Sequence, residues 1–260
     1  MSFRCSALTW EVSPTFTLSV PNLEIPAGST TLVLGPSGCG KSTFLALLGR
    51  VNGSYFSDWD VQAPSGTCHL IGQGDEVELV SASEAQLLRG RVRGDQVGFV
   101  FQQEALFSDL SPCENVAWSL LSRGMSSDEA TDRAQRMLEQ VGLAGDRETA
   151  SLSGGERKRL AFARTMVLEP RVLLLDEPFT GLDPQAHSEL LGLLKAFAAD
   201  ETHTVVMVTH QRKDLESIGD MLIFMDEGSI RAAGPRESLQ EVLTAFLAGS
   251  DGPPESGGEG

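Results

Sequence analysis

Residues 35–43 of this chain read Gly35-Pro36-Ser37-Gly38-Cys39-Gly40-Lys41-Ser42-Thr43. The stretch matches the pattern GxxxxGK followed by Ser or Thr, and it lies between a β-rich run at 31–34 and an apolar, helix-like run at 44–51. Its glycines let the backbone turn N–H groups inward around an anion, and the start of the following helix adds a positive dipole. The stretch therefore predicts a phosphate-binding loop between a strand and a helix.

The same pattern assigns chemistry to single residues of the loop. Lys41 is expected to reach the β- and γ-phosphates of ATP, and the Ser42 hydroxyl is expected to ligate Mg²⁺. The whole of Gly35–Thr43 is predicted to surround the nucleotide. ATP and Mg²⁺ are the cofactors that this motif predicts.

The rest of the chain alternates between strand-like and helix-like patterns. Strands are expected at 1–34, 97–101, 172–175, 204–208 and 221–225, and helices at 126–142, 157–168, 184–199 and 211–217. Ser126 and Glu129 have the spacing of a capping box. The segment 52–96 is less regular and reads as strands and loops with a short helix at 81–89. Alternation of this kind predicts an α/β fold with a mainly parallel sheet.

Two carboxylates follow the apolar run Val172–Leu175 directly. Ligands bind at the carboxyl ends of strands in open α/β sheets, so Asp176 and Glu177 are expected at the binding edge. Asp176 is predicted to hold the Mg²⁺ shell, and Glu177 is the candidate base that polarises the attacking water.

A second anion-binding pattern precedes the helix predicted at 157–168. It consists of Leu152-Ser153-Gly154-Gly155-Glu156, in which a Ser and two glycines lead into a helix start. One ATP does not need two such devices from one subunit. We therefore expect this loop to serve the nucleotide of another subunit.

Composition limits the class of protein. The chain has 260 residues, with 20 Lys+Arg against 36 Asp+Glu and a net charge of -16. This acidity opposes binding to nucleic acid, which needs clustered Lys and Arg. No apolar run approaches the roughly 20 residues that cross a bilayer, and the start has no secretory pattern. Cys5, Cys39, Cys68 and Cys113 form no CxxC pair, which predicts a reduced cytoplasmic protein without structural zinc.

Taken in order, these motifs resemble the ATP-binding subunit of ABC transporters. The loop 35–43 resembles Walker A, 152–156 the signature, and Asp176-Glu177 the end of Walker B. Phe101-Gln102-Gln103 resembles the Q-loop, Gly181-Leu182-Asp183-Pro184 the D-loop, and Val208-Thr209-His210 the switch histidine. The likeness runs from about residue 2 to 235. It implies a P-loop NTPase core, with an antiparallel N-terminal β subdomain and a helical subdomain.

The resemblance also implies roles for individual residues. Gln102, preferred to Gln103 because it directly follows the aromatic residue, contacts Mg²⁺, and His210 holds the γ-phosphate. Ser153, Gly154, Gly155 and Glu156 close over the nucleotide of a partner subunit, and Asp183 lines the interface. Trp10 is expected to stack on adenine, with core packing as the alternative and Phe16 in reserve. Glu156 departs from the family, which usually has Gln there.

The implied organisation is a single ABC ATPase domain at 1–248. A helical subdomain at about 104–155 is inserted into it, and 249–260 is predicted to be a disordered acidic tail. The implied partners are transmembrane permease subunits and a second ATPase subunit, as a homodimer or a heterodimer. The resemblance also allows a substrate-binding protein as a partner, whereas no nucleic-acid partner is expected. The chain is thus expected at the cytoplasmic face of the inner membrane, with Phe107, Leu110 and Trp118 facing either the permease or the core.

Cargo is left open between two readings. The segment 102–110 and the ending 246–253 resemble Mla-type phospholipid transporters, and 88–102 resembles lipoprotein-releasing and macrolide-type exporters. The segments 8–10 and 14–20 are similar to thiamine-type importers. The sequence therefore predicts either lipid or lipoprotein transport or the import of a small solute. A soluble ABC ATPase that acts on DNA or ribosomes is disfavoured by the acidic charge and by the absence of coiled-coil or zinc patterns.

Overall fold

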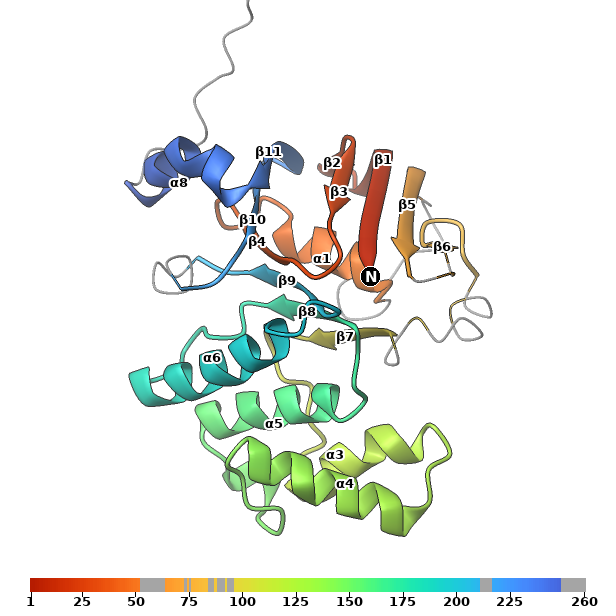
Figure 1. Ribbon diagram of the computed structural model, residues 1–260, viewed down its shortest axis with the longest axis vertical. Helices are drawn as coiled ribbons and strands as arrows, with labels where there is room; N and C mark the ends of the chain where they lie inside the picture. Colours follow the sequence, from red (N-terminus) through yellow and green to blue (C-terminus); the bar gives the residue numbers. More distant parts are fainter. Residues whose placement is uncertain are drawn as a thin grey trace, which may run out of the picture.

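A sheet of eleven strands runs through the molecule, and helices cover both of its faces (Figure 1). The computed structural model describes residues 1–51, 64–72, 74, 76–83, 87, 92, 96–210 and 217–248. Along the main path of the sheet the strand order is β6-β5-β1-β2-β11-β10-β4-β9-β8-β7, and β3 pairs with β1. The predicted α/β fold is confirmed.

Five neighbouring strands form the parallel part of the sheet. They are β10 (Met221–Asp226), β4 (Thr30–Leu34), β9 (Thr204–Val208), β8 (Val172–Asp176) and β7 (Val97–Val100). Every residue of β4, β8 and β9 is buried, as expected for central strands covered by helices on both faces. Because these strands are parallel, their carboxyl ends meet at one edge of the sheet.

The antiparallel part comes largely from the N-terminal half. It contains β1 (Ser2–Ser13), β2 (Phe16–Val20), β3 (Leu23–Ile25), β5 (Ser65–Ile71), β6 (Glu76–Glu78) and, from near the C-terminus, β11 (Ser229–Pro235). β11 pairs antiparallel with β10 and meets β2 at Ser229 and Ser19, so it joins the two parts. This agrees with the expected antiparallel N-terminal subdomain.

Two hydrophobic cores lie on opposite faces of the parallel strands. Alternate residues of one strand enter different cores: Leu174 packs with helix α1 (Lys41–Gly49) and β1, whereas Leu173 and Leu175 pack with helix α5 (Gly154–Met166) and helix α6 (Pro184–Ala198). Near the C-terminus, η3 (Arg236–Leu239) leads into α8 (Gln240–Leu247), whose Leu243 joins the second core. The central strands thus lie between two layers of helices, and alternate side chains of a strand pack into each layer.

A helical pair stands apart from the sheet, between β7 and α5 in the chain (Figure 1). Helix α3 (Pro112–Leu121) begins with a capping box between Ser111 and Glu114, and helix α4 (Ser127–Gln140) packs on it. The short η2 (Thr149–Ser151) then leads to α5. At α4 the expected capping box is half present: the Ser126 hydroxyl accepts from the Glu129 amide at 3.4 Å.

Several helix boundaries differ from the sequence expectation. α1 begins at Lys41 rather than 44, and α5 begins at Gly154 rather than 157, because Ser153 caps it. Most of the expected helix at 211–217 and most of that at 81–89 lie outside the described residues, as does the tail from 249. In the described ranges, no helix combines the length and apolarity that crossing a bilayer requires.

Candidate nucleotide-binding and catalytic site

The glycine-rich loop connects the end of β4 to the start of α1, as its pattern predicted. Gly35 has φ +148°, and a Cβ there would lie 2.1 Å from the Met225 carbonyl oxygen. Gly40 has φ +103°, and a Cβ there would lie 2.6 Å from Cζ of Phe16. Both positions therefore require glycine. The loop ends at the N-terminus of α1, whose free N–H groups favour an anion.

Lys41 lies inside this loop and is only 7% exposed. Its Nζ donates hydrogen bonds to the carbonyl oxygens of Gly35 at 2.9 Å and of Pro36 at 2.6 Å. The third donor of the ammonium group points at Cys39 Sγ, 3.9 Å away, a weak acceptor that a phosphate oxygen can replace. The side chain is held at the position from which it can reach a nucleotide.

Ser42 and Asp176 form a pair that fits Mg²⁺. The Ser42 Oγ donates to Asp176 Oδ1 at 3.0 Å, and Asp176 is 0% exposed. No cluster of three or more His, Cys, Asp or Glu side chains that could hold a metal occurs among the described residues. One hydroxyl and one buried carboxylate suit Mg²⁺, which fills its octahedron with waters and substrate phosphates.

Glu177 follows Asp176 at the same strand end and is surrounded by polar groups. Its Oε2 accepts from Gln102 Nε2 at 3.2 Å and from Thr180 Oγ1 at 3.1 Å. His210 Nδ1 lies 3.5 Å from Oε1. Gln102, Glu177 and His210 follow β7, β8 and β9, so the parallel sheet brings together three residues that are far apart in the sequence.

The Ser153–Glu156 segment caps its own helix. The Ser153 amide donates to Glu156 Oε2 at 2.8 Å, the Glu156 amide donates to Ser153 Oγ at 3.3 Å, and Arg147 pairs with Glu156. The backbone N–H of Ser153, with help from its hydroxyl and from Arg147, lowers the pKa of Glu156. Among the described residues, no hydrogen bond joins Ser153 or Glu156 to the phosphate-binding loop, and α5 and α1 lie on opposite sides of the sheet (Figure 1).

Asp183 is placed by the turn that follows Glu177. It is the N-cap of α6, and its Oδ1 accepts from the amides of Gln185 at 2.9 Å and of Ala186 at 3.0 Å. The glycine at 155 lets α5 approach this helix, because a Cβ there would lie 2.8 Å from Cβ of Ala186. Asp183 and the start of α5 are thereby held close together.

Trp10 does not offer a surface to a nucleotide, which corrects the expectation of adenine stacking. The residue is 3% exposed and packs in the core beneath β1. The cause is a bulge: β1 changes register between Ser6 and Thr9, where Ala7 has φ +46°. One extra residue turns the following side chains to the other face, so Leu8 and Trp10 point inward.

Phe16, the reserve candidate, lies beside the loop instead. Its ring is the group that would meet a Cβ at Gly40, and it is only partly buried. It starts β2, directly after the turn that follows Ser13. An aromatic ring therefore borders the end of the phosphate-binding loop.

Four further side chains at the site were not predicted from the sequence. Thr180 donates to Glu177, Lys158 contacts the Glu177 carbonyl, Arg147 pairs with Glu156, and Arg164 donates to the Ala105 carbonyl at 2.8 Å. Thr180 is three residues after Glu177 in a tight turn, so its spacing was a usable signal. The other contacts depend on how α5 packs.

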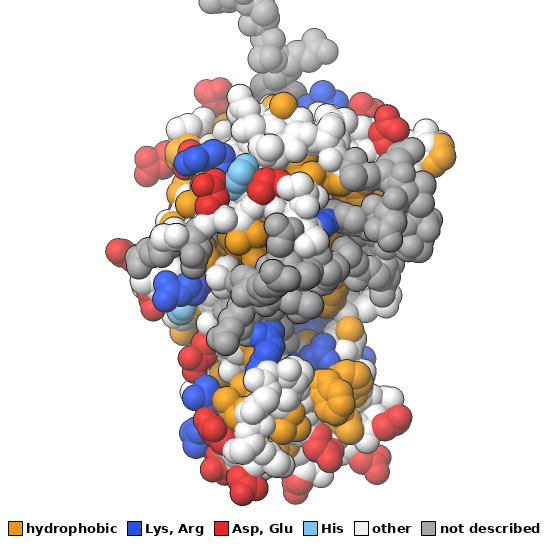
Figure 2. Space-filling view, turned by 90° about the vertical axis from the view of Figure 1, so that its right-hand side faces the viewer, with side chains coloured by type: hydrophobic (Ala, Val, Ile, Leu, Met, Phe, Trp, Pro, Cys, Tyr) orange, Lys and Arg blue, Asp and Glu red, His pale blue; other side chains and the backbone are white. Residues whose placement is uncertain are grey.

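An apolar groove of about 430 Å³ lies between the segment after Gln102 and helix α3. Phe107 is 44% exposed, Trp118 is 53% exposed, and their rings meet edge to face at 5.8 Å. Buried Asn115 holds the Phe107 backbone through both its N–H and its carbonyl. Figure 2 shows hydrophobic side chains gathered at the surface in the lower part of the molecule, where α3 to α5 lie.

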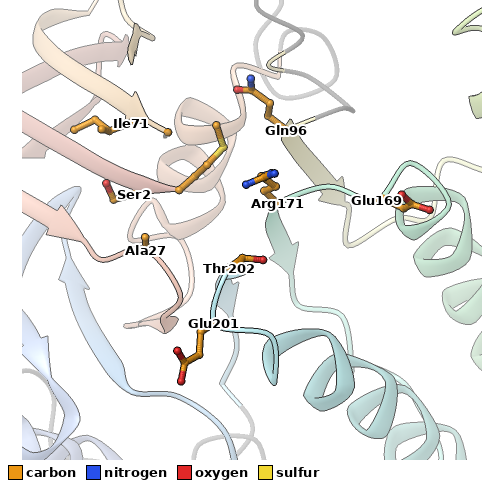
Figure 3. Close-up of a pocket in the computed structure, with 10 residues that line it drawn as sticks. Ser2, Ala27, Ile71, Gln96, Glu169, Arg171, Glu201 and Thr202 are labelled. Carbon is orange, nitrogen blue, oxygen red and sulfur yellow. The ribbon is translucent and has the colours of Figure 1, made fainter. Parts of the chain in front are cut away.

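A second cavity, of about 550 Å³, opens at the opposite edge of the sheet (Figure 3). Gln96, Arg171 and Thr202 line it, and each precedes a parallel strand. The carboxyl ends of those strands carry Gln102, Glu177 and His210, so this cavity is separate from the candidate nucleotide site. The size of this cavity therefore does not mark it as the nucleotide-binding site.

Comparisons with known proteins agree with this geometry. The family model described as ABC transporter matches residues 18–180. The chain belongs to the ABC transporter family. It is similar to the dimeric ATP-binding cassette MJ0796 in a post-hydrolysis state with ADP and Pi, with a TM-score of 0.75 and 27% identity, covering 90% of this chain and 98% of that one. It also resembles cbiO1 of Clostridium perfringens, with a TM-score of 0.72, 29% identity and 94% coverage of each chain.

Two curated relatives are import proteins. The Fe(3+) ions import ATP-binding protein FbpC of Agrobacterium fabrum is 37% identical over 230 residues, which cover 87% of this chain and 59% of FbpC. The sulfate/thiosulfate import ATP-binding protein CysA of Acinetobacter baylyi is 37% identical over 234 residues, which cover 87% of this chain and 60% of CysA. The chain thus spans about 60% of the length of these relatives.

Proposed function

We propose that the chain is the ATP-binding subunit of an ABC importer, which hydrolyses ATP to ADP and phosphate and drives a solute through a separate transmembrane permease. The observation that carries the proposal is the meeting of three parts at one sheet edge. They are the loop that holds Lys41, the Ser42–Asp176 pair, and Glu177 beside Gln102 and His210. We assign residues 1–248 to a single ABC ATPase domain that contains the helical segment 104–155.

The chain's own residues supply most of the mechanism. The N–H groups of the loop and the Lys41 ammonium bind the β- and γ-phosphates. Ser42, Asp176 and Gln102 hold Mg²⁺, which when bound neutralises charge on the phosphate oxygens. Glu177 accepts a proton from the water that attacks the γ-phosphorus. His210 borders the γ-phosphate and, with Gln102 and Thr180, holds the Glu177 carboxylate in place.

A second subunit completes each site in this proposal. Ser153 to Glu156 cap α5 and lie across the sheet from their own phosphate-binding loop, which supports binding to the nucleotide of a head-to-tail partner. The structural relative with ADP and Pi is dimeric. Asp183, next to the start of α5, is assigned to the interface. The partner is a second copy of this chain or a related ATPase.

Base stacking is assigned to Phe16. Base–aromatic stacking contributes about 1–3 kcal/mol per base, so Phe16→Ala is expected to raise the Kd for ATP by roughly five- to a hundredfold. Phe16→Tyr retains a ring and is expected to bind normally. Kd is measured by titration of a fluorescent ATP analogue and its displacement by ATP.

Trp10→Leu is the matched comparison for this prediction. It removes the ring but leaves an apolar side chain in the core, so it is expected to lower the melting temperature while ATP still binds as in the wild type. Weakened ATP binding by a folded Trp10→Leu protein, together with normal binding by Phe16→Ala, would assign base stacking to Trp10 instead.

The groove lined by Leu106, Phe107 and Trp118 is assigned to the permease. Exposed apolar patches on a soluble domain mark interaction sites, and this one follows Gln102 directly in the chain. In this proposal, contact at the groove links the nucleotide site to a membrane partner, and we assign the chain to the cytoplasmic face of the inner membrane. The cargo proposed is a small solute or inorganic ion, as in FbpC and CysA. These relatives give no support to lipid or lipoprotein transport, so that expectation is withdrawn.

The experiment that tests the proposed function co-expresses the chain with candidate transmembrane permeases from the same genome and measures binding to the permease and ATP-dependent solute uptake. Trp118→Glu is expected to abolish both, because a carboxylate would be buried in an apolar interface at a cost of several kcal/mol.

Leu121→Glu is the control for that variant. It adds the same charge to the same helix at a residue that is 40% exposed and lies outside the groove. The docking assignment fails if Trp118→Glu and Leu121→Glu retain the permease equally well. The importer proposal fails if the wild-type complex hydrolyses no ATP or moves no solute inward.

A further inference from the structure

Lys158 is a buried cation behind the catalytic carboxylates. It lies on α5, five residues after the Ser153 cap, and is 9% exposed. Its Nζ donates to the backbone carbonyl of Glu177 at 3.3 Å. Burying an ammonium group costs free energy unless charges or hydrogen bonds compensate it. The buried Lys158 ammonium group therefore needs compensating partners, and the Glu177 carbonyl is one of them.

Carboxylates face Lys158 from two segments. Glu104 lies on the segment after Gln102, and Asp176 and Glu177 lie at the end of β8. Burial lowers the pKa of Lys158, and the charges of these three carboxylates oppose that lowering only in part. His210 also lies beside Glu177, with its Nδ1 3.5 Å from Oε1. Lys158 thus brings a positive charge to the Asp176-Glu177 pair from the face of the sheet that α5 covers.

Glu177 needs such support because its backbone is strained. It has φ +47°, a left-handed conformation that costs a residue with a side chain about 1–2 kcal/mol. Strain of this kind persists where the surroundings hold the backbone on several sides. The Glu177 amide donates to the Val208 carbonyl at 3.1 Å, and the Glu177 carbonyl accepts from Lys158 Nζ and from the Thr180 amide, both at 3.3 Å. The amide is therefore held from β9, and the carbonyl is held from α5 and from the turn that follows it.

We propose that Lys158 is a positioning residue for ATP hydrolysis. Its ammonium group holds the Glu177 carbonyl, keeps that residue in its left-handed conformation, and so directs the carboxylate toward Gln102 and His210. Lys158 acts through Glu177 and does not touch ATP. The inference rests on the proposed function, in which Glu177 is the base.

The position of Lys158 on α5 adds a second consequence. The same helix begins with the Ser153–Glu156 segment, which is assigned to the partner's nucleotide. A displacement of α5 when the dimer closes is transmitted through Lys158 to Glu177. The hydrogen bond therefore connects the site that a subunit offers its partner with the base that it uses itself.

The test replaces Lys158 by Met, which has a similar length and no charge, and by Arg, which restores a donor. Misplacement of the base predicts that kcat of Lys158→Met falls by about ten- to a hundredfold, while the Kd for ATP stays near the wild-type value. Lys158→Arg is expected to recover most of kcat. Lys195→Met removes the same charge from α6, away from this site, and is expected to keep wild-type kcat.

A double variant separates positioning from simple destabilisation. If Lys158 acts through Glu177, Lys158→Met adds little to the single-turnover defect of Glu177→Gln. The inference is overturned by wild-type kcat in Lys158→Met, by a defect that Arg does not rescue, or by additive losses in the double variant. If Lys158→Met does not fold, the comparison of Lys158→Gln with Lys158→Arg decides it by the same criteria. Normal hydrolysis by Glu177→Gln alone would instead refute the proposed function.

Discussion

Glu177→Gln is expected to bind ATP but to hydrolyse it at about a hundredth to a ten-thousandth of the wild-type rate. The amide keeps the size of the side chain and can still accept from Gln102 and Thr180, which lie 3.2 and 3.1 Å from Oε2. It cannot accept the proton of the attacking water at neutral pH. Phosphate release under single-turnover conditions, with and without Mg²⁺, measures the effect.

The same variant is expected to accumulate as a dimer when ATP is present, because the proposed sandwich opens only after hydrolysis. Gel filtration with ATP, and with ADP for comparison, measures this. Glu139→Gln, an exposed change on α4, is the control and is expected to behave as wild type. A Glu177→Gln protein that stays monomeric with ATP would refute the head-to-tail mechanism, even if its hydrolysis were lost.

Lys41→Ala is expected to weaken ATP binding by about ten- to a hundredfold, since a hydrogen bond to a charged group contributes about 1.5–3 kcal/mol. The loss is expected to be much smaller for AMP, because Lys41 is assigned to the β- and γ-phosphates. Isothermal titration with ATP, ADP and AMP measures the difference.

Folding has to be checked in this variant, because Lys41 Nζ also donates to the carbonyls of Gly35 and Pro36. Circular dichroism and thermal melting provide that check. Lys195→Ala lowers the net charge equally and is expected to bind ATP normally. Wild-type affinity for ATP in a folded Lys41→Ala protein would contradict the assigned phosphate contact.

The class of fold could be predicted because its signals are local. The loop 35–43 needs a strand before it and a helix after it, and both are present as β4 and α1. Residues 172–175 of β8 and 205–208 of β9 are buried and apolar throughout, as is typical of parallel strands covered on both faces. Asp176, Glu177 and His210 follow such runs, so the expectation that they share one sheet edge needed only the parallel arrangement.

The residue proposed to stack on adenine could not be predicted from such local signals. In a regular strand, buried Phe3 and Cys5 would place the even-numbered Trp10 on the opposite, outer face. The bulge at Ala7 reverses this, and Trp10 enters the core while Phe16 reaches Gly40. The residues around Ala7 carry no sequence signal for the bulge, because the bulge depends on the pairing of β1 with β5, which is distant in the sequence.

The sequence by itself therefore determined the nucleotide chemistry that we propose for this protein: a glycine loop with Lys41, a hydroxyl and a carboxylate for Mg²⁺, and a glutamate as base. These follow from residue types at short, rigid spacings. Only the tertiary structure decided which side chains support them, such as Lys158 behind Glu177 and Phe16 beside the loop. Those contacts join elements that meet across the sheet, and the packing of helix on strand, rather than any local pattern, sets their distances.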